Sequence, residues 1–430
     1  MRVNPKDNVP GLTAWPPNED VHLGAPSPPV KTLRPVAARA GTFMTAIDAA
    51  IGLPETSPHD KHEAQARLME AFKTLLQDNA REALFLGGLL IGLAFGYTAA
   101  RANFCVMGAI SDWRTFASPG RLGAVALAAA IAIAGAQTLD ALHLADLSLS
   151  MFLAPSISAI GATLGGLVFG AGMVYAGGCA SRNLVRAGAG DLRALVVLTV
   201  LAIAAFAAIS GVISPLRATF ETATAFDVSA NRELARLSGP LTAVAGLEAQ
   251  TARAAMAAVL IAPLLGFAFA KANLARDPVN LLAGLAIGGL ITAGWFVSGL
   301  AYDDMALRPM PPMSLSFVRP VADAIDWLER SSALGLPGFG AASVFGALAG
   351  SFLASVFAGR FKVSGFADRG DILRHLGGAA AMGIGGVFAL GCSIGQGLTG
   401  LSTLSVQSLL AASSIFAGAW LALGRLERDL

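Results

Sequence analysis

The stretch "GLVFGAGMVYAGGCASRNLVRAG", residues 166–188, joins an apolar run to a cysteine and then to two arginines. It overlaps the charge-free run 147–181, which is long enough for a membrane helix. Two glycines stand directly before Cys179, so the stretch predicts a helix that breaks at Gly178 and a short polar helix that begins at the thiol. Broken helices at membrane depth are tolerated only where they line a cavity or lie inside the protein.

The composition of the whole chain agrees with a membrane location. Charged residues make up 13% of the sequence and hydrophobic residues 55%, whereas a soluble domain has about 25% charged residues. The net charge of +2 gives no reason to expect a nucleic-acid partner. Apolar stretches without charges recur along the chain, at residues 83–100, 122–139, 147–181, 194–216, 254–270, 279–302, 331–359 and 376–424.

These runs hold roughly nine spans of about 20 residues each. Because backbone groups in lipid must be paired within the segment, the spans are predicted to be helical. We expect an all-α polytopic membrane protein of the inner (plasma) membrane, with short re-entrant half-helices between the spans. No cofactor, metal site or catalytic residue is predicted.

The chain divides into membrane and polar segments. We expect a polar N-terminal extension at 1–81 with amphipathic helices near 36–51 and 68–76, and a short polar tail at 425–430. Between them lie a first transmembrane half at 82–216, an extramembrane loop at 217–250, and a second transmembrane half at 251–424 with an extramembrane insert at 303–330.

An internal repeat brings the three cysteines to one position. A Gly-x3-Gly-x8-Cys pattern ends at Cys105 and again at Cys179, and a further shift aligns Gly178 and Cys179 with Gly391 and Cys392. A fourth copy is suggested at 284–300, where Val297 or Ser298 stands at the thiol position. Four related units in two pairs predict an inverted-repeat transporter with its substrate site at the repeat interface.

The residues around the thiols favour an anion as the substrate. Half-helices present free N–H groups and the positive end of the helix dipole, which attract anions. A thiol near a dianion is expected to act as a neutral S–H donor, and a soft, sulfur-bearing anion suits it better than sulfate or phosphate. Asn183 and Gln396 are equivalent amides expected to line the path, and Arg182 either belongs to it or marks the inner interface.

Simpler roles compete with this interpretation. A buried cysteine is often a small hydrophobic residue, and glycines at a spacing of four allow membrane helices to pack closely. Packing alone does not explain why every cysteine of the chain occupies the same repeat position.

Three segments carry a resemblance to a known family: "GYTAARANFCVMGAISDW", "GAGMVYAGGCASRNLVRAGAGDLRAL" and "GGVFALGCSIGQGLTGLSTLS". Across residues 82–424 the sequence resembles the YeeE/YedE family of sulfur-compound transporters. The resemblance implies an hourglass-shaped inverted repeat that imports thiosulfate, passed from thiol to thiol along Cys105, Cys179 and Cys392. It also implies that Gly178 and Gly391 form the breaks.

Other functions stay open at this point. The resemblance extends to selenium compounds as cargo, and a cytosolic sulfur-carrier protein is a candidate partner. The residues themselves also allow a membrane thiol or persulfide enzyme that handles sulfane sulfur, although such an enzyme usually needs a resolving thiol near the first. A channel or structural protein with packed thiols is the third alternative.

Overall fold

The computed structural model describes residues 77, 79–227, 249–305, 309–366 and 368–429. The amphipathic helices predicted near 36–51 and 68–76 lie outside the described residues. The same is true of residues 228–248, the larger part of the loop predicted at 217–250.

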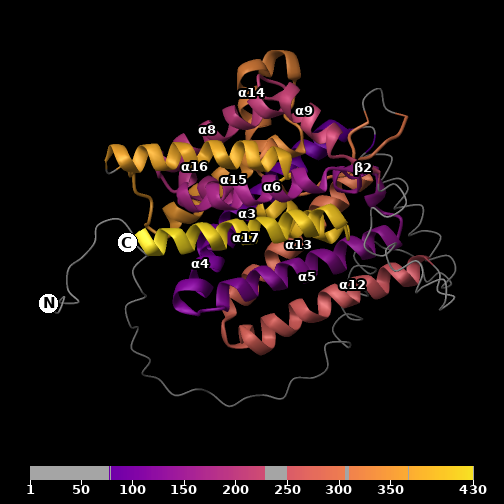
Figure 1. The fold of residues 1–430 in the computed structure, drawn as a ribbon. Coiled ribbons are helices and arrows are strands. Elements are labelled where there is room, and N and C mark those ends of the chain that lie inside the picture. The colour runs from indigo at the N-terminus through magenta and orange to yellow at the C-terminus, as the bar shows by residue number, and fades with distance from the viewer. Residues whose placement is uncertain (1–76, 78, 228–248, 306–308, 367, 430) are drawn as a thin grey trace. The chain divides into compact units, whose positions relative to one another are not determined.

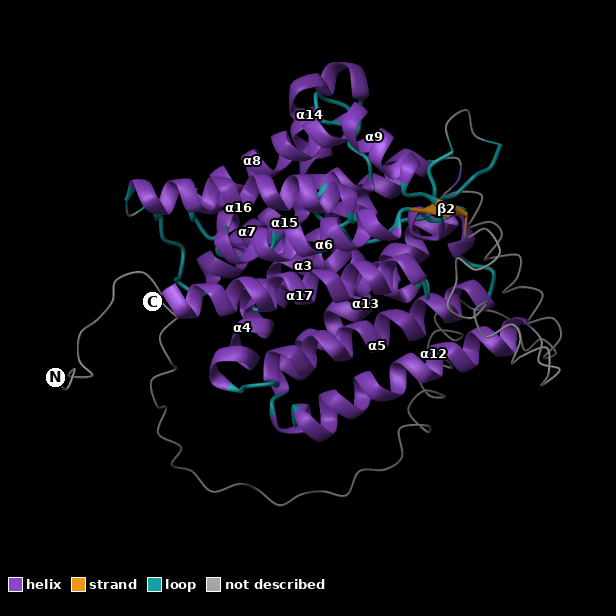
Figure 2. Cartoon of the chain, viewed as in Figure 1, coloured by secondary structure: helices purple, strands orange, loops and turns teal. Residues whose placement is uncertain are grey.

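Helices account for nearly all of the regular structure (Figure 2). The α-helices are α3 (Ala80–Ala102), α4 (Val106–Phe116), α5 (Gly120–Ala141), α6 (Ala159–Tyr175), α7 (Ala180–Gly188), α8 (Leu192–Ile209), α9 (Ser214–Ala223), α12 (Ala249–Gly266), α13 (Pro278–Leu300), α14 (Arg319–Leu334), α15 (Phe339–Phe357), α16 (Arg369–Phe388) and α17 (Val406–Asp429). Two π-helical turns are η3 (Phe267–Lys271) and η5 (Gly395–Gly400). Short 3-10 turns are η1 (Leu147–Leu149), η2 (Met151–Leu153) and η4 (Leu274–Arg276), and β1 (Ser156–Ile157) pairs antiparallel with β2 (Phe226–Asp227).

Eight helical segments of the described residues are long and apolar enough to cross a membrane. Two of these segments combine a long helix with a half-helix, because α4 continues α3 and α7 continues α6 after a break. The structure therefore confirms an all-α polytopic membrane protein.

The helices form four units of similar order, each with a long helix, a short helix and a second long helix. Unit A is α3–α4–α5 and unit B is α6–α7–α8. Unit C is α13–α14–α15, and unit D is α16–η5–α17 (Figure 1).

Contacts between these units follow a reciprocal rule. The first helix of unit A, α3, packs against the last helix of unit C, α15, and α5 packs against α13 in return. Units B and D repeat this exchange, since α6 packs against α17 and α8 against α16. The short helices show the same exchange. The contact of α4 with α17 corresponds to that of α14 with α8. The contact of α7 with α15 corresponds to that of η5 with α5. Reciprocal contacts of this kind are what a two-fold relation between two halves produces.

Close helix packing depends on glycines at the unit interfaces. A Cβ on Gly92 or Gly96 of α3 would lie 2.2 Å from the carbonyl oxygen of Ser343 or 2.1 Å from that of Ala347, both on α15. These two helices approach backbone to backbone, as small-xxx-small patterns permit in membranes.

Unit C differs from the fourth copy suggested by the sequence. The helix α13 continues through Val297 and Ser298 to Leu300 without a break. The short helix of this unit begins only at Arg319, after the irregular segment 309–318. Leu315 and Phe317 of this segment are fully buried in the same core cluster as the three cysteines. Part of the insert expected outside the membrane thus contributes to the protein core.

Candidate functional site

The three cysteines follow helix ends that share one backbone geometry. A residue in the left-handed region stands two positions before each cysteine. These residues are Asn103, Gly177 and Leu390, with φ values of 53°, 67° and 55°. In each case the amide of the next residue closes the end by donating to a carbonyl five residues back. The bonds run from Phe104 to Ala99, from Gly178 to Met173 and from Gly391 to Gly386, at 3.0, 2.9 and 2.8 Å. This is a Schellman-type helix end.

Each cysteine then stands directly before a half-helix: Cys105 and Cys179 are the N-caps of α4 and α7, and Cys392 precedes the helical residues that lead into η5. The amide three residues further along donates to the sulfur of Cys105 at 3.3 Å and to that of Cys392 at 3.2 Å. Cys179 caps α7 by position, and its sulfur lies 3.3 Å from the Ser181 hydroxyl. All three thiols are free and buried. The repeat therefore places each thiol at the positive end of a half-helix, as the sequence predicts.

The breaks bring two thiols together. Cys105 and Cys179 are direct neighbours that interact through their sulfur atoms, and we call them the thiol pair. The Ser393 side chain, next to Cys392 in the chain, also acts on the Cys179 sulfur. Cys392 itself lies against Ser316 and the backbone of Phe317, so the thiol-free unit C forms one wall at the third cysteine.

Arg182 brings an uncompensated positive charge to the thiol pair. Its side chain is largely buried and interacts electrostatically with both sulfur atoms. The neighbouring cations are Arg121 and Arg186, which form ion pairs with Asp112 at 2.9 Å and Asp191 at 2.6 Å. No carboxylate pairs with Arg182 among the described residues. An arginine stays charged even when it is buried, so this position attracts an anion.

The two predicted lining amides turn their NH2 groups back towards the breaks. Asn183 Nδ2 donates to the Gly178 carbonyl at 2.8 Å, and Gln396 Nε2 donates to the Ala389 carbonyl at 2.6 Å. Their oxygen atoms, Oδ1 and Oε1, are buried without a hydrogen-bond partner in the part of the chain that the structure describes. The groups they can offer to a substrate or a thiol are therefore acceptors.

The predicted break glycines give room to the half-helices that follow them. A Cβ on Gly178 would lie 2.9 Å from Cγ of Arg182, and one on Gly391 would lie 3.2 Å from Cγ of Gln396. A larger residue at either position would push against the side chain that follows the thiol.

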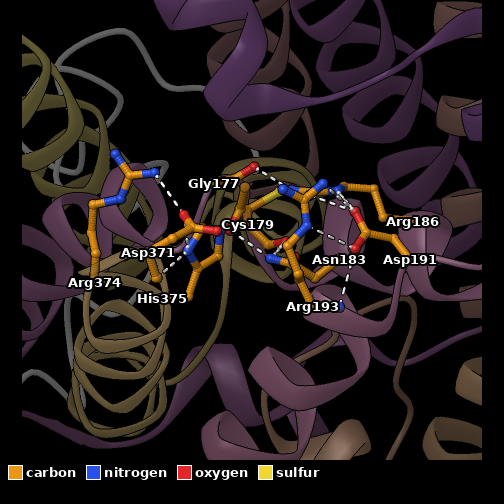
Figure 3. Close-up of polar contacts among 10 residues, drawn as sticks. Gly177, Cys179, Asn183, Arg186, Asp191, Arg193, Asp371, Arg374 and His375 are labelled. Carbon is orange, nitrogen blue, oxygen red and sulfur yellow. Dashed lines mark hydrogen bonds and ion pairs between the residues drawn. The ribbon is translucent and has the colours of Figure 1, made fainter. Parts of the chain in front are cut away.

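Sequence reasoning missed a polar cluster behind Cys179 (Figure 3). Arg186 donates to the Gly177 carbonyl at 3.0 Å and is held by Asp191. On the other side of the turn, a Cβ on Gly177 would lie 3.2 Å from Nε2 of His375, whose Nδ1 is 2.8 Å from the Asp371 carbonyl. Charged residues beside a Gly-Gly break were the only signal in the sequence, and there they resembled ordinary interface residues.

Comparison with known proteins identifies the family. A family model described as sulphur transport matches residues 101–421. A protein of Spirochaeta thermophila named thiosulfate transporter TsuA is 28% identical over 345 residues, which cover 77% of this chain and 96% of that protein. A protein of the same name from Escherichia coli is 25% identical over 349 residues, covering 79% of this chain and 94% of its own length. The matched region contains all three capped thiols and Arg182, and the chain belongs to the sulphur transport family, the YeeE/YedE family that its sequence resembles.

Proposed function

We propose that this membrane transporter imports thiosulfate across the inner membrane along a path formed by Cys105, Cys179 and Cys392. The observation that carries the proposal is Arg182, which has no carboxylate partner in the described part of the chain, beside two thiols at the N-caps of half-helices. Thiosulfate has a soft terminal sulfur at one end and hard oxygens at the other. The thiols suit the sulfur end through S–H···S contacts, and the guanidinium suits the oxygens.

The arrangement of the units supports a stepwise passage. The thiol pair comes from units A and B, whereas Cys392 comes from unit D and lies against unit C. An anion that moves between the thiol pair and Cys392 therefore crosses from one set of half-helices to the other. Gly178 and Gly391 shape the two turns at this crossing, and the acceptor oxygens of Asn183 and Gln396 orient S–H groups towards the path.

The proposal also gives the protein an orientation. Arg114 at the end of α4 pairs with Glu427 at 3.1 Å, and this end of α17 also carries Arg425 and Arg428. In Figure 1 the C-terminal end of α17 and the N-terminal end of α16, preceded by Arg360 and Lys362, lie on the same side. Because basic residues collect on the inner side of membranes, we place this side in the cytosol. A cytosolic sulfur-carrier protein would receive the anion there.

The test is uptake of sulfur-labelled thiosulfate by cells that lack any other thiosulfate route. Cys179→Ser keeps a hydrogen donor but loses the soft sulfur, so uptake is expected to fall to the level of cells without the transporter. Ser413→Ala, an exposed position on α17, is the expression-matched control and should transport normally. Wild-type uptake by Cys179→Ser would contradict the thiol path, and uptake of selenite or sulfate instead of thiosulfate by the wild type would contradict the substrate.

A further inference from the structure

An arginine braces the break before each member of the thiol pair. Arg121 Nη2 donates to the carbonyl of Asn103 at 2.9 Å, and Arg186 Nη1 donates to the carbonyl of Gly177 at 3.0 Å. Both carbonyls belong to the left-handed residue two positions before the cysteine. The two arginines therefore bind the same point of the same turn in units A and B.

An aspartate fixes each arginine in place. Arg121 pairs with Asp112 at 2.9 Å, and Arg186 contacts one oxygen of Asp191 at 3.0 Å through Nε and 2.6 Å through Nη2. We call each set of arginine, aspartate and turn carbonyl a clasp. Burial by itself would raise the pKa of the Asp191 carboxyl, but hydrogen bonds from Arg193 and the charge of Arg186 outweigh burial and lower it.

The chain order of the partners is reversed between the two clasps. In unit A the aspartate lies on the half-helix α4 and the arginine on the following helix α5. In unit B the arginine lies on the half-helix α7 and the aspartate is the N-cap of the following helix α8. Each clasp thus ties the break, the half-helix and the next helix together, although no single aligned residue does so in both units.

Glycines give the arginines access to the turns. A Cβ on Gly108 would lie 2.4 Å from Nη2 of Arg121, and one on Gly177 would lie 3.2 Å from Nη1 of Arg186. The guanidinium groups therefore pass over positions that lack a side chain.

The break before Cys392 differs from the other two in the side chains that bind it. No arginine donates to the Leu390 carbonyl among the described residues. Within the described part of the chain, the side chain that binds this turn is that of Gln396, whose neutral Nε2 donates to the Ala389 carbonyl at 2.6 Å. A charge-assisted bond is roughly twice as strong as a neutral one, so the first two turns are held more firmly than the third.

We propose that Arg121 and Arg186 are positioning residues that hold Cys105 and Cys179 at the spacing of the thiol pair. The effect of this positioning on transport rests on the proposed function. An anion shared between two thiols requires both sulfur atoms at fixed positions. A displacement of about 1 Å is enough to weaken such a site strongly.

The first experiment measures alkylation of each cysteine by N-ethylmaleimide in the full-length protein, read by peptide mass spectrometry. Lysine keeps the charge but cannot bind the aspartate and the carbonyl together. We therefore expect Arg186→Lys to raise the alkylation rate of Cys179 about tenfold, because the loss of one charge-assisted bond has an effect of this order. The alkylation rate of Cys392 should stay unchanged. Arg193→Lys is the matched control, because Arg193 also binds Asp191, at 3.1 Å, but makes no bond to the Gly177 carbonyl.

The clasp of unit A is tested in the same way. Gly108→Ala should displace Arg121 and raise alkylation of Cys105, whereas Gly266→Ala, where a Cβ meets nothing within 4 Å, should have no effect. An equal rise at all three cysteines, or the same rise in Arg193→Lys as in Arg186→Lys, would overturn the proposal. Alkylation does not depend on the substrate, so a failure of thiosulfate uptake in the wild type would leave this result interpretable.

A transport measurement separates positioning from general damage. Arg186→Lys should raise the apparent KM for thiosulfate about tenfold at matched protein levels, with the maximal rate changed much less. A loss of maximal rate at an unchanged KM would contradict a role in holding the thiol pair.

Discussion

Arg182 is a largely buried cation that forms no ion pair with a carboxylate of the described residues. In a region of low dielectric, such a charge interacts strongly with any anion that reaches it. Arg121 and Arg186 are also nearby, but their aspartates already compensate them. The surroundings of Arg182 are therefore suited to an anion, in agreement with the proposed function.

This charge gives the first prediction. Arg182→Gln removes the attraction for a dianion, so the apparent KM for thiosulfate should rise by about tenfold to a hundredfold. Arg182→Lys keeps the charge, so its apparent KM should lie between those of the wild type and Arg182→Gln. The measurement is the concentration dependence of uptake, with Arg217→Gln, which alters the separate ion pair to Glu221, as the control. An unchanged KM in Arg182→Gln would remove Arg182 from the path.

A second prediction concerns pH and Asp191. The pKa of this carboxyl in the folded protein is lower than in the unfolded chain. Its ion pairs therefore contribute stability above the unfolded pKa, and this contribution is lost as the pH falls through the folded pKa. The difference in thermal midpoint between wild type and Asp191→Asn should stay constant from about pH 5 to pH 8 and shrink below about pH 4. A difference that already shrinks near neutral pH would contradict this.

At the residue scale the sequence revealed the thiols but not how their neighbours are used. The shared repeat position predicted that all three cysteines follow a break, and the structure confirms this. The clasps were not predictable, because their arginines and aspartates exchange places between units A and B. The orientation of Asn183 and Gln396 depends on carbonyls that only the folded turns expose.

At the scale of the elements, the close packing of α3 against α15 depends on glycines, which have no side chain to separate the two backbones. Gly96 faces the Ala347 carbonyl so closely that an added methyl group must separate the two helices. Gly96→Ala is expected to destabilise the protein by about 1–3 kcal/mol, the usual cost of overpacking. Gly289→Ala on α13 is the control, since a Cβ there meets nothing within 4 Å and alanine favours a helix. Thermal unfolding in detergent compares them, and equal midpoints would show that the contact can relax.

The irregular segment 309–318 explains why the fourth unit was located only in part. Alignment by glycine spacing found its first helix, α13, and then looked for the thiol position at Val297 or Ser298. The chain instead inserts a loop before α14, so the equivalent short helix begins much later. Sequence spacing cannot reveal an equivalence that an insertion has displaced.

For the whole molecule, the reciprocal contacts make two similar halves, whereas the charges make its two faces different. The acidic stretch Asp140–Asp146 begins in the last turn of α5, at the end opposite to Arg121. Cysteines introduced at two exposed positions test the resulting orientation: Leu142 is 61% exposed and Val363 is 63% exposed. In intact cells a membrane-impermeant maleimide should label Leu142→Cys directly and Val363→Cys only after permeabilisation. The native thiols are buried and contribute little background. The opposite labelling pattern would reverse the orientation.

The overall architecture was predictable because the signals that encode it are repeated. Hydrophobic runs predicted roughly nine spans, against eight suitable helical segments among the described residues, and the recurrence of Gly and Cys indicated related units. The pairing of A with C and of B with D was not predictable, since it depends on contacts between segments far apart in the chain.

The sulfur caps have a consequence for chemical reactivity. At Cys105 and Cys392 the sulfur accepts a backbone N–H and keeps its hydrogen and a second lone pair. A neutral thiol is a weak nucleophile, whereas an N–H donated to sulfur at a helix N-terminus favours the thiolate, the form that attacks sulfane sulfur. The thiol path that we propose therefore requires these thiols to stay protonated, because a thiolate would take the outer sulfur of thiosulfate as a persulfide and release sulfite.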